Sequence, residues 1–403
     1  MMTTRYLIVA DDFTGANDTG IQMKKRGINV DVLLSPSFHS SSIVLDTESR
    51  NLNANDSYYK VFKMVSEVCS LSYFDIIYKK VDSTLRGNIA HEIKAIADVY
   101  HPDLIVFAPA FPKMNRITKN GKQYLNDEPL MNTELTKDPL SPIKTDNLVE
   151  ILNQAFKESI RYHEVSELDN NCFNISDEYL HVIDIVSDKQ ISDLSKILLK
   201  LNKKILYVGS AGLAEGLFNS LYPTDPVLGV VASISQVSIE QINYAESEGI
   251  NIVKIEPADI FNNETYNKYA EEICLKLSQK KDVILTTCKN KSDYDKTLAF
   301  SEKNGILFHD AITKVKECLG SIVDIVLKNV SISGLFLTGG DTAVNIVNKI
   351  QAAGCCIKQE ISSGIVMSTL IHERYGNIKI VTKAGAFGTK KDIVTSINKL
   401  KEK

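Results

Sequence analysis

The chain has 403 residues, with 46 Lys and Arg against 50 Asp and Glu, so its formal net charge is −4. This length exceeds what one hydrophobic core usually serves, which predicts at least two domains. The near-neutral charge is atypical of proteins that hold nucleic acid on a broad basic surface. No apolar run approaches the roughly 20 residues of a membrane span. We therefore expect small-molecule partners, with no nucleic acid and no membrane.

The N-terminus and the cysteines predict a cytoplasmic protein. The first apolar stretch begins close to the start and is followed by acids, which is not the order of a secretory signal peptide. The seven cysteines are an odd number, and none lies in a CxxC spacing. We expect reduced thiols in or near the core, with no disulfide framework.

Short β-rich runs alternate with longer amphipathic stretches, a pattern typical of α/β layers with mainly parallel sheets. In chain order, the predicted strands are Tyr6–Ala10, Ser42–Leu45, Asp75–Lys79, Leu104–Ala108, Lys204–Val208, Val227–Val231, Asp282–Thr286, Leu335–Thr338 and Ile378–Thr382. Helical spacing of apolar residues predicts helices over Ala16–Arg26, Tyr58–Ser70, Asn88–Tyr100 and Ala343–Ala352. The expected fold is two α/β domains whose sheets are flanked by helices.

Two segments break this alternation. Phe111–Ile143 is rich in Pro, Asn, Lys and Asp without a sustained period, and we expect an ordered, irregular excursion over the surface. Leu221–Pro226 carries two prolines around polar residues and reads as a linker. We therefore predict an N-terminal domain over residues 1–224 and a C-terminal domain over residues 225–403.

Polar residues follow the first three predicted strands. In open α/β sheets, ligands bind beyond the carboxyl ends of the strands. Asp11 and Asp12 come directly after the first strand and suit contacts with hydroxyls or a metal, although Asp12 could instead cap the next helix. Arg50 follows the second strand. The mixture predicts a pocket for a small polyol acid, with carboxylates accepting from hydroxyls and cations holding the acid group.

The turn after the third strand is the densest group of donors in the chain. It contains Lys80, Asp82, Ser83, Thr84, Arg86 and Asn88. The helix that follows adds a terminus whose dipole favours anions. Arg86 can hold a carboxylate or phosphate through two parallel hydrogen bonds, and we expect Arg50 and Arg86 together to hold the acid group or its neighbouring oxygen. The alternative interpretation is a solvated polar loop.

The second domain lacks a P-loop motif but has a different candidate for phosphate binding. Leu335–Thr338 runs into Gly339, Gly340, Asp341 and Thr342, where a helix begins. Two glycines expose backbone amides at a helix N-terminus, an arrangement that can hold phosphates. The alternative is a tight turn with Asp341 as the helix N-cap. Lys383 and Gly385 follow the last strand, and the histidines show no metal-like spacing, so any metal site is unknown.

Several of these motifs, taken in order, resemble the four-carbon acid sugar kinase family. They are ADDFTGANDTG, KKVDSTLRGN, PAFPKMNR with TELTKDPLSPI, GSAGLAEGL, LTGGDTA and KAGAFG. The resemblance covers nearly the whole chain. It implies a two-domain kinase with an acid-sugar domain and an ATP domain, acting on threonate, erythronate or 3-oxo-tetronate at the 4-hydroxyl. ATP and Mg²⁺ are the implied cofactors, and an alcohol group is the implied acceptor.

The resemblance also implies site residues. The acid-sugar contacts fall on Asp11, Asp12, Arg50, Lys80, Asp82, Ser83, Thr84, Leu85, Arg86 and Asn88. The nucleotide contacts fall on Ser233, Ser235, Gly339, Gly340, Asp341, Thr342, Lys383 and Gly385. The chain departs from the family pattern at Ala232–Ser235, where the family shows Gly-Ser and then Pro-Val-Thr, and at Asn115-Arg116, where it shows Gly-Arg.

Two carboxylates are the catalytic candidates. We expect Asp341 to act as the general base and Asp12 to orient the substrate hydroxyls, with the active site in the cleft between the domains. The rival functions are a non-catalytic sugar-acid sensor and an NAD-dependent sugar-acid oxidoreductase. The second would need a GxGxxG motif, which the GSAG segment does not match. A homodimer is left open.

Overall fold

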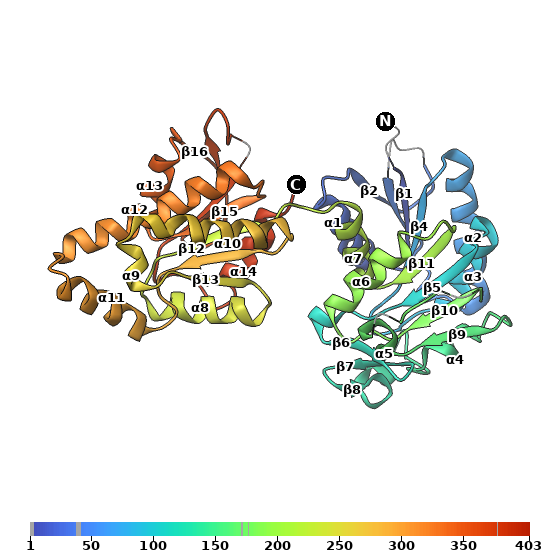
Figure 1. Ribbon diagram of the computed structural model, residues 1–403. Coiled ribbons are helices and arrows are strands. Elements are labelled where there is room, and N and C mark those ends of the chain that lie inside the picture. The colour runs from blue at the N-terminus through green and yellow to red at the C-terminus, as the bar shows by residue number, and fades with distance from the viewer. Residues whose placement is uncertain (1–3, 38–41, 171, 176, 377) are drawn as a thin grey trace. The chain divides into compact units, whose positions relative to one another are not determined.

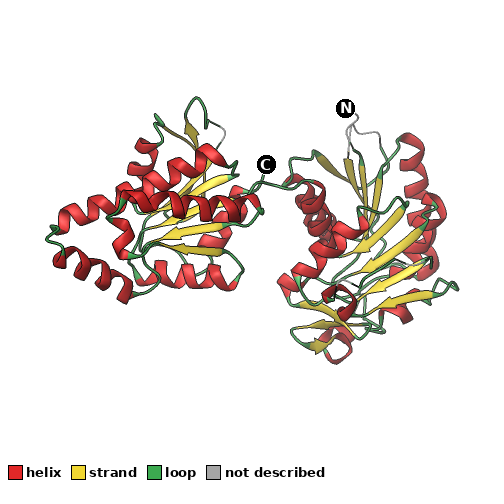
Figure 2. Cartoon of the chain, in the orientation of Figure 1, coloured by secondary structure: helices red, strands yellow, loops and turns green. Residues whose placement is uncertain are grey.

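The computed structural model describes residues 4–37, 42–170, 172–175, 177–376 and 378–403 (Figure 1). The chain divides after Pro223 into two units, and the second runs from Thr224 to Glu402. Each unit is built on its own mainly parallel sheet with helices on both faces (Figure 2). The predicted fold class of two α/β domains is therefore confirmed, whereas a cleft between them as the active site stays a prediction.

The sheet of the first unit has eight strands, all parallel, in the order β2-β3-β1-β4-β11-β5-β10-β9. In that order they are Val30–Leu33, Ser42–Asp46, Tyr6–Ala10, Ile76–Lys80, Ile205–Gly209, Leu104–Ala108, Leu180–Ile183 and Ile160–His163. Central strands such as β1 and β5 are buried along their whole length. Continuous burial is expected where helices cover both faces of a parallel sheet.

The first unit has two hydrophobic cores, one on each face of its sheet, and alternate residues of β1 pack into each of them. Leu7 and Val9 pack towards α2 (Ala54–Leu71), α3 (Ile89–Tyr100) and α4 (Leu148–Leu152), and Tyr6 and Ile8 pack towards the opposite layer. That opposite layer consists of α1 (Phe13–Lys24), α6 (Asp188–Leu198) and α7 (Ala211–Leu221), and a short helix, α5, spans Val165–Asp169.

The expectation of an irregular excursion over Phe111–Ile143 was partly wrong. The segment forms a three-stranded antiparallel sheet of β6 (Arg116–Lys119), β7 (Lys122–Leu125) and β8 (Glu128–Pro129). Asn120 and Gly121 join β6 to β7 with φ values of 55° and 69°, as a two-residue hairpin turn requires. Three 3₁₀ turns accompany the sheet, at Pro112–Met114, Leu130–Asn132 and Glu134–Lys137.

The sheet of the second unit has seven strands in the order β13-β14-β12-β15-β18-β17-β16. In that order they are Asn251–Lys254, Val283–Thr286, Val227–Val231, Gly334–Thr338, Lys379–Lys383, Ile365–Ile371 and Gly354–Ser362. The first five strands are parallel, and β17 and β16 complete the sheet in antiparallel fashion.

Helices cover both faces of this second sheet as well. One face packs against α10 (Tyr266–Ser278), α12 (Phe308–Asn329) and α13 (Gly340–Lys349), and the other against α8 (Gln236–Ser247) and α14 (Asp392–Leu400). The shorter α9 spans Pro257–Ile260, a 3₁₀ turn spans Asn263–Thr265, and α11 spans Lys291–Lys303. Among the described residues, no helix combines the length and apolarity that a bilayer crossing requires.

The predicted strands match the observed ones to within one residue at each end. Three helices begin earlier than predicted: α1 starts at Phe13, α2 at Ala54 and α13 at Gly340, because their first turns hold few apolar residues and lack the helical apolar spacing. The expectation that the thiols lie in or near the core was wrong for Cys172, Cys355 and Cys356, which are exposed, although all seven cysteines are free as predicted.

Both sheets reverse their winding direction at an interior strand. In the first unit, the chain runs from β1 to the edge strand β2 and comes back to β3, which lies between β2 and β1. It then crosses to β4 on the other side of β1. In the second unit, β12 plays the same part, with β15 on its other side. Such switch points leave a crevice at the carboxyl ends of the strands, where α/β proteins bind their ligands.

Candidate functional site

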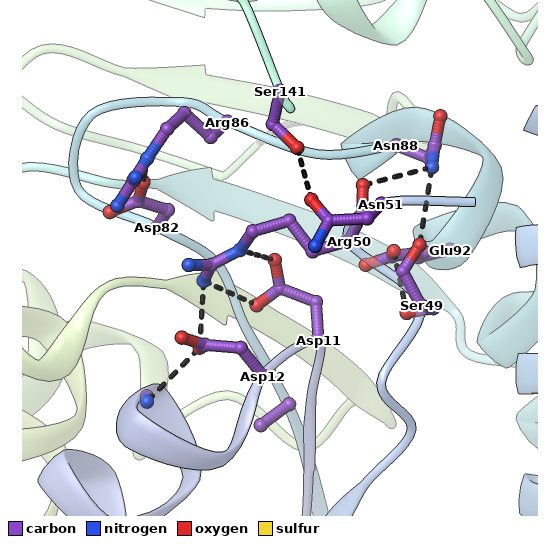
Figure 3. Close-up of polar contacts among 12 residues, drawn as sticks. Asp11, Asp12, Ser49, Arg50, Asn51, Asp82, Arg86, Asn88, Glu92 and Ser141 are labelled. Atoms are coloured by element: carbon purple, nitrogen blue, oxygen red, sulfur yellow. Dashed lines mark hydrogen bonds and ion pairs between the residues drawn. The ribbon is translucent and has the colours of Figure 1, made fainter. Parts of the chain in front are cut away.

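The switch point of the first unit brings together the residues that follow β1, β3 and β4 (Figure 3). Arg50 donates from Nε to Oδ2 of Asp11 at 2.7 Å and from Nη2 to Oδ1 of Asp12 at 2.7 Å. Asp12 also caps α1, because its Oδ1 accepts from the amide of Gly15. The capping and functional interpretations of Asp12 are therefore compatible, since its second oxygen is not used by the cap.

Electrostatics keep these groups charged. Burial opposes ionisation of Asp11, but the charge of Lys79 and the contact with Arg50 outweigh it, so the pKa of Asp11 lies below its ordinary value. Burial likewise opposes ionisation of Asp82, and Arg86 outweighs it, so the pKa of Asp82 is lowered too. The site thus presents carboxylates, which accept hydrogen bonds and do not donate them.

The turn after β4 is fixed by its own side chains. Arg86 Nε donates to Asp82 Oδ2, and the hydroxyl of Thr84 donates to the same oxygen at 2.7 Å. Leu85 has a φ of 58° and is 4% exposed, so its side chain belongs to the hydrophobic core. Asn88 Nδ2 donates to the carbonyl of Leu52 at 2.7 Å, which ties this turn to the residues after Arg50. The two predicted strand ends are therefore held against each other.

Gly87 permits this close approach. Its φ is +95°, a conformation that favours glycine, and a Cβ placed there would lie 3.1 Å from Asp11 Oδ2. The same Cβ would lie 3.4 Å from Cγ of Arg50. Any side chain at this position would therefore crowd the Arg50–Asp11 pair.

Two adjoining cavities open at these strand ends. The Asp138 pocket has a volume of about 260 Å³ and is lined by Asp11, Asp12, Glu48, Arg50, Asn51, Arg86, Asp138, Leu140 and Ser141. The Lys80 pocket has a volume of about 300 Å³ and is lined by Asp12, Thr14, Gly15, Asp18, Arg50, Lys80, Asp82, Ser83, Arg86, Phe111, Ser210 and Ala211. Asp12, Arg50 and Arg86 are common to both cavities, so the two form one polar region.

Lys80 differs from the two arginines in having no partner among the described residues. Arg50 is bound to Asp11 and Asp12, and Arg86 to Asp82 with Asp138 at 3.5 Å. Lys80 is 5% exposed and lines the pocket named after it, close to several carboxylates. Burial lowers the pKa of its ammonium despite those negative charges. Its three N–H groups are the donors left for a ligand.

Two residues of the segment after β8, Asp138 and Ser141, complete this site, and no local sequence signal predicted them. Asp138 accepts from the amides of Leu140 and Ser141, and Ser141 Oγ lies 2.6 Å from Asn51 Oδ1 (Figure 3). These contacts close the far wall of the Asp138 pocket. The TELTKDPLSPI motif contains both Asp138 and Ser141, but nothing in the local sequence shows that it folds back onto the strand ends.

At the switch point of the second unit, Gly339 ends β15 with a φ of +86° and is itself the N-cap of α13. The alternative interpretation of Asp341 as N-cap was therefore wrong, because Asp341 lies inside the first turn. Its side chain is 85% exposed and pairs with Lys316 of α12 at 3.1 Å. A Cβ added to Gly340 would meet no atom within 4 Å, so this helix start faces open space.

A mainly apolar pocket of about 290 Å³ lies beside this helix start. Its lining consists of Ala232, Ile234, Thr287, Cys288, Tyr294, Thr297, Leu298, Phe308, Ala311, Ile312, Val315, Lys316 and Thr342. Its volume is near the lower limit for small-molecule sites, about 300 Å³, and its apolar walls suit a flat heterocycle. Of the predicted nucleotide contacts, Thr342 is in this lining. Most of the other wall residues belong to α11 and α12 and carry no motif.

Three other predicted nucleotide contacts, Ser235, Lys383 and Gly385, hydrogen-bond to one another. The hydroxyls of Ser235 and Ser238 both donate to the carbonyl of Gly385, at 2.8 and 2.7 Å. Lys383 Nζ donates to the carbonyls of Ala384, Gly385 and Phe387, which uses all three of its N–H groups. Ser233 Oγ lies 2.6 Å from where a Cβ on Gly385 would be. These residues form a polar junction between the ends of β12 and β18.

Over the described residues, no three His, Cys, Asp or Glu side chains are grouped so that they could hold a metal ion by themselves. Mg²⁺ commonly binds through one or two carboxylates together with waters and substrate phosphates. An exposed carboxylate at a helix start, as in Asp341, with the hydroxyl-bearing Thr342 next to it, fits that mode of binding.

The fold and the two pockets define a two-domain α/β protein that offers one polar, charged region and one mainly apolar pocket, each at a topological switch point. Comparison with known proteins agrees. The family described as "Sugar-binding N-terminal domain" matches residues 6–217, and the family described as "Nucleotide-binding C-terminal domain" matches residues 228–393.

Relatives of full length carry kinase names. The D-threonate kinase of Salmonella typhimurium is 31% identical, with 99% of both chains covered. The D-erythronate kinase of Heliobacterium modesticaldum is 22% identical over 98% of this chain and 96% of its own. A Bordetella bronchiseptica protein, solved with citrate as a domain-swapped dimer, has the same fold, with a TM-score of 0.67, 24% identity and 99% of both chains covered. The chain therefore belongs to the four-carbon acid sugar kinase family.

Proposed function

We propose that this protein transfers a phosphoryl group from ATP to a four-carbon sugar acid, with the 4-hydroxyl as acceptor. The observation that carries the proposal is the polar region at the β1–β4 switch point. There, ionised carboxylates and an ammonium that has no partner among the described residues line adjoining cavities. That combination matches a substrate with several hydroxyls and one carboxylate. Relatives named D-threonate, D-erythronate and 3-oxo-tetronate kinase support the same substrate class.

Recognition of the acid follows from which charges are already paired. Arg50 and Arg86 are each held by carboxylates of the protein, so a substrate carboxylate would have to compete for them. Lys80 needs no such exchange, and we assign it the substrate carboxylate. Asp12 then accepts from the substrate hydroxyls, since it lines both cavities. Both arginines keep the carboxylates in place.

The nucleotide is assigned to the second unit. The apolar pocket takes the base, and the amides of Gly340 and Asp341 at the start of α13 take phosphate oxygens, where the helix dipole favours negative charge. Bound with the phosphates, Mg²⁺ would neutralise charge as the phosphoryl group moves. Thr342 would hold it through its hydroxyl oxygen, and Asp341 would hold it through water, which leaves the Asp341 carboxylate able to accept a proton.

Two carboxylates remain candidates for the general base. A base must lie within hydrogen-bond reach of the hydroxyl that it deprotonates. Asp341 would lie beside the transferring phosphate, and Asp12 lines the cavities assigned to the sugar acid. We retain Asp341 as the base and Asp12 as the residue that orients the hydroxyls, and the Asp341→Asn variant separates the two roles.

The test is an ADP-release assay with ATP and Mg²⁺ over both enantiomers of threonate and erythronate and the 3-oxo-tetronates. We expect turnover with one of these acids, and ³¹P NMR of the product to show a phosphomonoester on C4. Absence of turnover with all of them would refute the kinase assignment.

Thermal shift separates the rival functions, because a ligand that binds the native state raises its apparent stability. A shift with NAD and none with ATP and Mg²⁺ would favour an oxidoreductase, and a shift with the sugar acid alone a sensor. The homodimer and the cytoplasmic location stay predictions.

A further inference from the structure

A buried ion pair lies next to the polar region without being part of it. Lys79 of β4 is 0% exposed and its Nζ lies 2.6 Å from Oε2 of Glu92 of α3, which is 1% exposed. Neither residue is among the described residues that line the two cavities. The pair therefore has no direct contact with a ligand bound there.

Such a pair is weak evidence of a role in stability. Removing two charges from water costs free energy that their mutual attraction does not always recover, and apolar replacements are often neutral or stabilising. A buried pair is better explained by what its remaining hydrogen bonds hold in place.

Those hydrogen bonds lead to Arg50. Glu92 Oε1 accepts from the hydroxyl of Ser49 at 2.7 Å and from the hydroxyl of Ser57, on α2, at 3.0 Å. The amides of Ser49 and Arg50 both donate to the carbonyl of Asp11, at 3.1 and 3.3 Å. Ser49 thus joins the buried pair to the turn that carries Arg50, as Figure 3 shows.

We infer that Glu92 and Ser49 are positioning residues, which fix the turn after β3 and thereby hold Arg50 against Asp11 and Asp12. The inference rests on the proposed function, because it assigns those three residues to the sugar-acid site. Lys79 lies against Oε2 of Glu92, and Oε1 accepts from both serine hydroxyls, so the carboxyl group is fixed on both sides. A site held by such a supporting layer is set in the geometry that binds its ligand before the ligand arrives.

The two serines provide a matched pair of variants. Both are fully buried and both donate to the same oxygen of Glu92, but Ser49 belongs to the Arg50 turn and Ser57 to α2. Ser49→Ala and Ser57→Ala each remove one hydroxyl. We expect similar losses of thermal stability from both.

Kinetics should separate them. Misplacing a binding group by about 1 Å can cost up to about 10²-fold, so we expect Ser49→Ala to raise KM for the sugar acid by about tenfold or more, with KM for ATP unchanged. Ser57→Ala should leave both KM values within about twofold of wild type. If either alanine variant fails to fold, Ser49→Cys and Ser57→Cys replace them, since a thiol fills the same space and donates only weakly.

Equal changes in KM for the sugar acid in the two variants, or none in either, would overturn the inference and leave the network as packing. The wild-type protein tests the other proposal separately. If it phosphorylates no four-carbon acid, the proposed function is wrong. If it is active and the serine variants do not differ, only the positioning role is wrong.

Discussion

Replacing Lys80 by Met should affect binding and stability in opposite directions. Lys80 is 5% exposed, its ammonium has no hydrogen-bond or ion-pair partner among the described residues, and burial lowers its pKa. A lowered pKa for a basic group means that its charged form is less favourable in the folded protein than in the unfolded chain. Methionine fills nearly the same volume without that cost, so the apo variant should unfold at the same or a higher temperature than wild type.

Catalysis should suffer instead. Removing one member of a buried, hydrogen-bonded pair of charges costs about 2–5 kcal/mol of binding free energy, and Lys80→Met removes the member that would hold the substrate carboxylate. Since 1.36 kcal/mol is a factor of ten, kcat/KM for the sugar acid should fall by roughly 30-fold to more than 10³-fold. Because the nucleotide is assigned to the second unit, KM for ATP should change by less than about threefold if KM reports binding.

The assay combines initial rates of ADP release, over ranges of sugar acid and ATP, with thermal unfolding of the apo protein. Lys189→Met is the control, because Lys189 is an exposed residue of α6 that pairs only with Asp193 along its own helix among the described residues. The control should behave as wild type. An unchanged kcat/KM for the sugar acid in Lys80→Met, or equal losses for both substrates, would show that Lys80 does not hold the carboxylate.

Three further predictions concern other residues. Asp341→Asn should lower kcat by about 10²–10⁴-fold with little change in KM for the sugar acid, as loss of a general base requires; near-normal kcat would exclude Asp341 and direct the same test to Asp12. Ile312 lies half-exposed at the apolar pocket, and a tryptophan there would fill part of the space assigned to the adenine ring. Ile312→Trp should therefore raise KM for ATP by about tenfold or more and leave KM for the sugar acid unchanged. Equal effects on both KM values would show that the adenine ring binds elsewhere. Asp46 is 1% exposed, and burial raises its pKa to about 6, so its ionised form costs stability above that pH. The unfolded pKa is about 3.9, roughly two pKa units lower, so Asp46→Asn should stabilise the protein by up to about 3 kcal/mol at pH 7.5, and the gain should disappear as pH falls towards 4. Urea unfolding at both pH values measures the gain, and a gain independent of pH would contradict the titration of Asp46.

Local sequence was enough to predict most of the scaffold. Buried runs such as Tyr6–Ala10 and Leu104–Ala108 are continuous apolar segments bounded by polar residues, and their strands form where predicted. Charged residues after the first three strands also marked the first candidate site, and the Gly339–Gly340 turn before a helix marked the second. The three-stranded insertion was missed because its strands are short and polar, although the Asn120–Gly121 turn was a readable signal.

The linings of the pockets could not be predicted in the same way. Asp138 and Ser141 reach the first site from a distant segment, and Phe308, Ile312 and Lys316 line the apolar pocket from one face of α12. A helical face is apolar whether it meets a sheet, another helix or a ligand, so its period does not distinguish these partners.

Lys79 and Lys80 show most directly what the sequence determined and what only the tertiary structure decided. The sequence placed both at the carboxyl end of one strand, and strand geometry points successive side chains to opposite faces of the sheet. Which lysine would pair with Glu92 and which would line a cavity depended on where α3 packs, and that depends on contacts between segments far apart in the chain. The fold pairs Lys79 with Glu92 of α3 on one face of the strand. It places Lys80 at the polar pocket, where it has no ion-pair partner among the described residues and can bind a ligand.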